Sequence, residues 1–433
     1  MSARLAAVLG LLAFGIVAGG ARAEAEEITR RTLSNGLRLL VRSDPTAEVV
    51  AVSLHVGAGS RFEGPEHAGL THFLHRVMLR GTTRRSATAL AETAEELGGT
   101  LDASGEVETG EVRAQALARH WEPLLALVAE VALTPTFPDE EVERERRLIL
   151  SQIHVRVDNP FLLALDALLG ALCGDHPCSR PSLGTVSSVG KLTRATLIAH
   201  HRDIYRPERL VLALSGQVEP TRVVRLVERL FGAMPRGAAV TPMPPPPPRP
   251  TGERRLLQRP VHEARILVGY LGPGLEEADY PAVRVLGAIL GGGMSGRLFV
   301  ALRENRGLAY SLGVLSPFRT APAFLVAHMG TDPANVEAAE AGLRAELERL
   351  RHEPVGDGEV ARGKAHVLGS LAMDRRTNAR HAWYLAFFEA VGAGWQFADH
   401  YTRAVQAVTA ADVLRVARKY LDRPTIVLLR RPG

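Results

Sequence analysis

Apolar residues recur at helical spacing through much of the first half of the chain. Residues 69–80 read GLTHFLHRVMLR, and their apolar members repeat at i, i+3, i+4, i+7 and i+8, the pattern of a helix with one buried face. The members of this stripe are Leu70, Phe73, Leu74, Val77 and Met78. Related patterns predict three more helices, at 86–97, 121–133 and 139–155. Between them, LGGTLDASGEVETGEVRAQAL combines a glycine turn with the alternation of strands.

The two halves of the sequence echo one another. Residues 191–216 and 407–431 each run from a threonine cap through an amphipathic helix, a tyrosine and Arg-Pro or Asp-Arg-Pro into an apolar run. The strand-like segments 37–59 and 254–274 also match, more loosely. The second half carries helical patterns at 280–292, 334–353 and 358–391. These features predict a duplicated α+β unit, with strands early and late and helices between them.

A proline run marks the boundary between the halves. TPMPPPPPRP, 241–250, cannot continue a helix or a central strand, because consecutive prolines favour a stiff, extended backbone. We therefore expect an N-terminal domain at 27–240, a linker at 241–251 and a C-terminal domain at 252–433.

The N-terminus has the pattern of a secretory signal peptide. A short basic region precedes an apolar run at 5–20, and Ala-Arg-Ala at 21–23 has the small residues that a signal peptidase requires. The alternative is a membrane anchor, but the run is short for a span of roughly 20 residues. We expect residues 1–23 to be removed before Glu24, no membrane span afterwards, and a secreted, periplasmic protein.

Charge and cysteine content narrow the function classes further. The formal net charge is +5, and removal of Arg4 and Arg22 with the signal segment leaves +3, with acids interspersed among the bases as in EEVERERR. This pattern is not that of a nucleic-acid-binding surface. The two cysteines, Cys173 and Cys178, allow a short disulfide loop in an exported chain, and the spacing alone leaves their pairing open.

Three polar side chains stand opposite the apolar stripe of residues 69–80. His72, His75 and Arg76 are expected to share one polar face, where they can bind, ionise or donate together. A polar helix face is usually only solvated, so the wider context has to decide between the two interpretations.

That context resembles the pitrilysin/insulinase family of zinc metallopeptidases. The resemblance runs through GLTHFLHRVMLRGTTRRSATALAETAEELGGTLDAS, FPDEEVERERRLILSQIHVRVDNP and GDHPCSRPSLGT, and in the second half through ILGGGMSGRLFVALRENRGLAYSLG. It covers essentially the whole mature chain. It implies two homologous α/β-roll-like domains with mixed, largely antiparallel sheets, which together form half of a peptidase clamshell.

The family uses an inverted H-x-x-E-H motif, in which two histidines and a later glutamate bind zinc and the motif glutamate is the general base. Here His72 matches the first histidine, His75 stands at the base and Arg76 at the second histidine. On the later helix the family has two glutamates seven residues apart. Glu145 matches the first, and Gln152 replaces the second, which is the zinc ligand.

These replacements predict that the chain lacks a zinc site of its own. A guanidinium has no lone pair to donate and repels a dication, and a neutral amide is a poorer zinc ligand than a carboxylate. We expect Arg76 instead to pair with Glu145, with a guanidinium taking the place of the metal charge. The catalytic and cofactor assignments for this chain are therefore none.

A second family feature is retained in LRENRGLAY, 302–310. Active members use an arginine and a tyrosine seven residues apart to bind the substrate backbone, which selects Arg303 and Tyr310, with Arg306 as the weaker choice. The alternative is that both side chains only stabilise a helix end and a sheet edge.

The resemblance implies a non-catalytic subunit. We expect it to pair with a zinc-bearing homologous peptidase subunit, which carries the zinc, and to help hold a peptide substrate. Two alternatives stay open: an autonomous metallopeptidase with an atypical site built on His72 and His75, and a purely structural or peptide-binding homologue.

Overall fold

The computed structural model describes residues 28–237, 246–247 and 250–432. The predicted signal peptide, 1–23, and most of the predicted linker, 241–251, lie outside the described residues. No helix in the described part of the chain is both long enough and apolar enough to cross a bilayer.

The first half folds around a mixed, largely antiparallel sheet. Its strands are β1 (Ile28–Thr32), β2 (Arg38–Ser43), β3 (Val49–Val56), β4 (Thr100–Gly105), β5 (Gly110–Leu117) and β6 (Leu210–Gly216). They lie in the order β1-β2-β6-β3-β5-β4, and only the β2–β6 pair is parallel. The helices are α1 (Leu70–Met78), α2 (Ala87–Glu96), α3 (Trp121–Leu133), α4 (Asp139–Asp158), α5 (Pro160–Cys173), α6 (Val186–Lys191), α7 (Arg194–Ile204) and α8 (Pro220–Phe231).

The second half repeats this plan. Its strands β7 (Arg254–Gln258), β8 (Ala264–Gly272), β9 (Ser311–Leu315), β10 (Ala323–Thr331) and β11 (Thr425–Arg430) lie in the order β7-β11-β8-β10-β9. The helices are α9 (Tyr280–Gly291), α10 (Val336–His352), α11 (Asp357–Asp374), α12 (Asn378–Ala390), α13 (Phe397–Ala407) and α14 (Ala410–Tyr420). In each sheet the last strand runs parallel to an early one and antiparallel to its other neighbour, as a duplicated unit requires.

The predicted elements are largely present, with one correction. The four helices predicted in the first half correspond to α1–α4, and the threonine caps of α7 and α14 are Thr193 and Thr409. The long helix predicted at 358–391 is wrong, because the chain breaks between α11 and α12. Thr377 caps α12 there by accepting a hydrogen bond from the Arg380 N–H at 3.3 Å.

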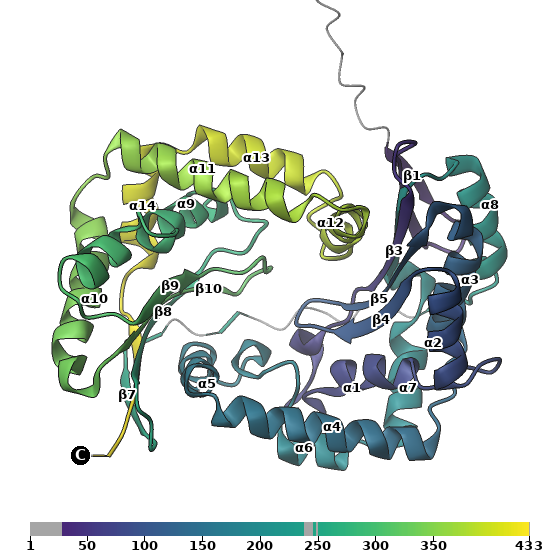
Figure 1. Cartoon of the computed structure of the whole chain (residues 1–433), viewed down its shortest axis with the longest axis horizontal. Coiled ribbons are helices and arrows are strands. Elements are labelled where there is room, and N and C mark those ends of the chain that lie inside the picture. The colour runs from purple at the N-terminus through teal and green to yellow at the C-terminus, as the bar shows by residue number, and fades with distance from the viewer. Residues whose placement is uncertain (1–27, 238–245, 248–249, 433) are drawn as a thin grey trace, which may run out of the picture.

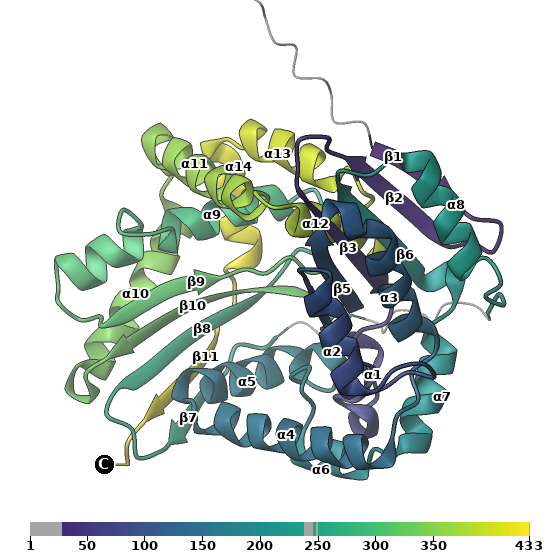
Figure 2. The same cartoon turned by 45° about the vertical axis from the view of Figure 1, so that its right-hand side comes forward.

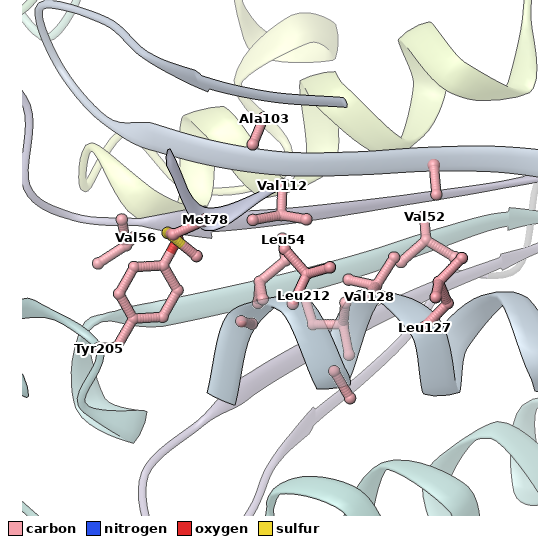
Figure 3. Packing of buried hydrophobic residues seen from close by; sticks show 14 of the residues in the cluster. Val52, Leu54, Val56, Met78, Ala103, Val112, Leu127, Val128, Tyr205 and Leu212 are labelled. Carbon is pink, nitrogen blue, oxygen red and sulfur yellow. The ribbon is translucent and has the colours of Figure 1, made fainter. Parts of the chain in front are cut away.

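Each sheet has one face against helices of its own half. Strand β3 shows why, because its alternate residues Val50, Val52, Leu54 and Val56 enter the core of the first half. Figure 3 shows part of this core, with the Tyr205 ring beside the strand residues.

The opposite face of each sheet is covered by a helix from the other half. Helix α5 packs on the second sheet and α12 packs on the first, as Figures 1 and 2 show from two directions. Leu168 of α5 lies directly on the β8 backbone at Gly269, where a Cβ would come within 2.7 Å of it. A disulfide between Cys173 and Cys178 closes the loop that follows α5, which settles the pairing that the sequence left open.

Because α5 covers the sheet of the other half, truncating its fully buried Leu168 is predicted to lower the free energy of unfolding strongly. Leu168→Ala is expected to lower the free energy of unfolding by about 3 kcal/mol, because the rigid sheet cannot collapse into the cavity. Urea denaturation followed by circular dichroism measures the change. Leu148→Ala on α4, where the side chain is 44% exposed, is the matched control and should cost less than about 0.5 kcal/mol. Equal losses in the two variants would contradict the packing described.

Candidate functional site

Helix α1 is fixed at its start by a buried carboxylate. Glu63 accepts hydrogen bonds from the Gly69 N–H at 2.8 Å and the Thr71 N–H at 2.6 Å, which satisfies free donors of the first turn. Burial raises the pKa of Glu63, and these bonds oppose that shift. Gly69 has φ of 90°, and a Cβ there would lie 2.5 Å from the Leu183 carbonyl oxygen. The predicted apolar stripe is buried, with every member at most 5% exposed.

The prediction that His75 shares a polar face with His72 and Arg76 is wrong. His75 is fully buried, its Nδ1 donates to the Thr71 carbonyl at 2.7 Å, and the Tyr205 hydroxyl donates to its Nε2 at 3.0 Å. Burial lowers the pKa of His75 to about 3, so the ring is neutral. Because a helix turns by about 100° per residue, His75 and Arg76 lie on opposite sides of His72. His75 therefore points toward the core, where Tyr205 is its hydrogen-bond partner.

His72 is the one motif histidine on the solvent side of α1, where it lies partly buried against β4. Burial is the main reason that its pKa is lowered, and the adjacent Arg76 contributes. Its Nε2 has no hydrogen-bond partner among the described residues.

Two arginine side chains neutralise the buried carboxylate of α4. Glu145 is fully buried, and the predicted contact with Arg76 is confirmed, with Nε 3.4 Å from Oε2. Arg80 forms a second ion pair with the other carboxylate oxygen. Sequence reasoning missed Arg80, although it stands one helical turn after Arg76 and therefore on the same face. Two guanidinium groups thus meet one carboxylate.

The side chains gathered here do not fit a zinc ion. Gln152, at the position of the carboxylate ligand, lies exposed on α4. It does not pair with the His72 Nε2, which has no hydrogen-bond partner among the described residues. His75 faces the core, Arg76 stands at the position of the second histidine ligand, and Arg80 adds a second positive charge at Glu145. Within the described ranges, no three His, Cys, Asp or Glu side chains gather as a metal site would require.

Arg303 and Tyr310 are brought together by the short π-helix Phe299–Glu304 and the start of β9. The Arg303 Nη1 donates to the Tyr310 carbonyl at 3.2 Å, and its guanidinium lies over the Phe299 ring. Both side chains are exposed, and Tyr310 is 60% accessible, so its hydroxyl is free to meet a ligand. The contact also joins a helix end to a sheet edge, as the structural alternative expected.

The fold and the site define a class: two sheet-and-helix units that cover each other's sheets, with arginine and amide side chains, Arg76 and Gln152, at two of the positions where the resemblance places zinc ligands. Two family models match the chain. "Insulinase (Peptidase family M16)" matches residues 38–186 and "Peptidase M16 inactive domain" matches residues 191–367. The chain belongs to the M16 peptidase family.

Relatives match along most of their length. An uncharacterized zinc protease of Mycobacterium tuberculosis is 33% identical over 400 residues, which cover 91% of each chain. The zinc protease YmxG of Bacillus subtilis is 28% identical over 354 residues, covering 82% of this chain and 86% of YmxG.

Solved structures share the fold. A protease from Helicobacter pylori has a TM-score of 0.87 and 21% identity, covering 94% of this chain and all of that chain. The peptidase M16 inactive domain from Pseudomonas fluorescens has the same TM-score with 23% identity, covering 94% of this chain and 98% of that one.

Proposed function

We propose that this chain is the non-catalytic subunit of a zinc metalloendopeptidase heterodimer. A homologous subunit with an intact H-x-x-E-H motif binds the zinc and performs hydrolysis, and this chain contributes peptide-substrate binding. The observation that carries the proposal is the double ion pair of Arg76 and Arg80 with Glu145. A buried carboxylate that is already neutralised by two cations no longer favours a dication beside it.

Arg303 and Tyr310 supply the peptide-substrate binding that this chain contributes to the heterodimer. An exposed guanidinium donates to peptide carbonyls, and a phenol hydroxyl can donate to the oxyanion that develops during peptide cleavage in the partner. Their exposure and proximity support this role.

The setting proposed for the heterodimer is the periplasm. The signal-type segment at 1–23 supports export. The Cys173–Cys178 disulfide supports it independently, because disulfides persist in oxidising compartments.

The test is a joint peptide-cleavage assay. This chain is co-purified with a zinc-bearing homologue that has the intact motif, and cleavage of an unstructured peptide is compared with and without it. Tyr310→Phe is expected to lower the joint turnover about 100-fold and Arg303→Ala at least about tenfold, without loss of co-purification. Arg229→Ala, at an exposed arginine of α8 in the other half of the chain, is the control and should leave turnover unchanged.

Other outcomes separate the alternatives. Full joint activity in both the Arg303 and Tyr310 variants would favour a purely structural subunit. Stoichiometric zinc in the isolated chain, with cleavage that is lost on His72→Ala, would favour an autonomous peptidase and overturn the proposal.

A further inference from the structure

A basic cavity lies far along the chain from the motif residues and plays no part in the proposed function. It has a volume of about 410 Å³ and lies between α12, α13 and the first strand. Its charged and titratable lining residues are Arg42, Arg375, Arg403, His381, His400 and Asp399. Of its three arginines, Arg42 pairs with Asp44 and Arg375 lies close to Asp399, which leaves Arg403 as the positive charge in excess.

The arginine at the base of this cavity is held in place. The Arg42 guanidinium is buried, donates to Asn378 Oδ1 at 3.0 Å and Ser215 Oγ at 3.2 Å, and pairs with Asp44 at 3.3 Å. These partners come from β6, from the start of α12 and from the turn after β2. The group is therefore preorganised by both halves of the molecule.

The other two arginines, Arg375 and Arg403, have fewer protein partners among the described residues than Arg42 has. Arg375 lies 3.8 Å from Asp399, and its guanidinium packs over the Tyr384 ring. The Nε of Arg375 is buried without a hydrogen-bond partner in the described part of the chain. Arg403 is exposed at the rim. A buried donor of this kind is costly unless a ligand satisfies it.

Apolar walls complete the cavity. Ile28, Leu385 and Trp395 line it beside the arginines, so a ligand that fits has a hydrocarbon part as well as anionic groups. The planar fork of a guanidinium matches a carboxylate with two parallel hydrogen bonds. We propose that this cavity binds a carboxylate-bearing ligand between Arg375 and Arg403.

The carboxylates can come from two sources with the same chemistry. One is a free polycarboxylate. The other is the chain itself, because Glu24, Glu26 and Glu27 stand directly before Ile28, which lines the cavity. The test therefore needs one protein with these glutamates and one without their charge.

Isothermal titration calorimetry with tricarballylate tests the proposal on two forms of the chain that begins at Glu24. One has the natural sequence, and the other carries Glu24→Gln, Glu26→Gln and Glu27→Gln. Equal binding to both forms indicates a free ligand, whereas binding only to the glutamine form indicates that the chain's own glutamates fill the cavity. Tricarballylamide, the uncharged analogue, should bind neither form.

Cavity variants localise the binding. Arg403→Gln and Arg375→Gln should each weaken tricarballylate binding at least about tenfold, because each removes a charge-assisted contact. Arg403 lies at the rim, so its replacement leaves the fold intact, as an unchanged melting temperature would show. Arg202→Gln, at an exposed arginine of α7, is the matched control. Absence of binding to both forms, or binding that Arg403→Gln leaves unchanged, overturns the proposal.

Discussion

The double variant Arg76→His/Gln152→Glu is expected to bind one equivalent of zinc, whereas the natural chain binds none. The substitutions add an imidazole and a carboxylate at the two positions that match the family's other zinc ligands, while the His72 Nε2 has no hydrogen-bond partner in the described part of the chain. They also remove one of the two cations at Glu145 and leave Arg80 to neutralise it. Metal content after gel filtration, measured by atomic spectroscopy, checks the result.

The control for this experiment removes His72, which with the two substituted side chains of the double variant completes the set of three zinc ligands. His72→Ala in the double variant should return zinc to background while the melting temperature stays close to that of the double variant. A double variant that is folded but free of zinc would show that α1 and α4 are not held at ligand distance. Stoichiometric zinc in the natural chain would show instead that the guanidinium groups do not exclude the metal.

The chain should lose stability steeply in mild acid. Burial lowers the pKa of His75 to about 3 and that of His200 to about 4, from an ordinary value of 6.5. Between these limits the unfolded chain binds protons that the folded chain does not, so the stabilisation is complete above pH 6.5 and is lost as the pH falls. At pH 5 each histidine accounts for a loss of about 2 kcal/mol.

Urea denaturation at pH 7.5 and pH 5.0 measures this loss. Carboxylates also titrate in acid, so the informative quantity is the change between a variant and the natural chain. His75→Gln is expected to reduce the difference in unfolding free energy between the two pH values by about 2 kcal/mol. An unchanged difference would mean that the ring is not held neutral between Thr71 and Tyr205.

The sequence predicted features that depend on local periodicity or on family spacing. The buried stripe of α1 follows from an i, i+3, i+4 repeat, and the Arg76–Glu145 contact follows from matched motif positions. His75 was misplaced because its environment is set by Tyr205, 130 residues later in the chain. A helical projection contains no information about a partner so distant.

Helices α5 and α12 mark another limit of sequence reasoning. The apolar run of α5 was not predicted as a helix, and α12 was merged with α11. Both are nearly apolar where they meet a sheet, and each meets the sheet of the opposite half. Periodicity within a segment cannot show which distant surface will cover it.

The mutual covering of the sheets has a consequence for how this chain can be divided. Fragments 28–237 and 250–432, produced apart, would each expose an apolar sheet face and an apolar helix, so neither should be soluble alone. Mixed during refolding, they have complementary surfaces and should reassemble without a covalent link. The two halves are therefore interdependent partners, each of which completes the core of the other.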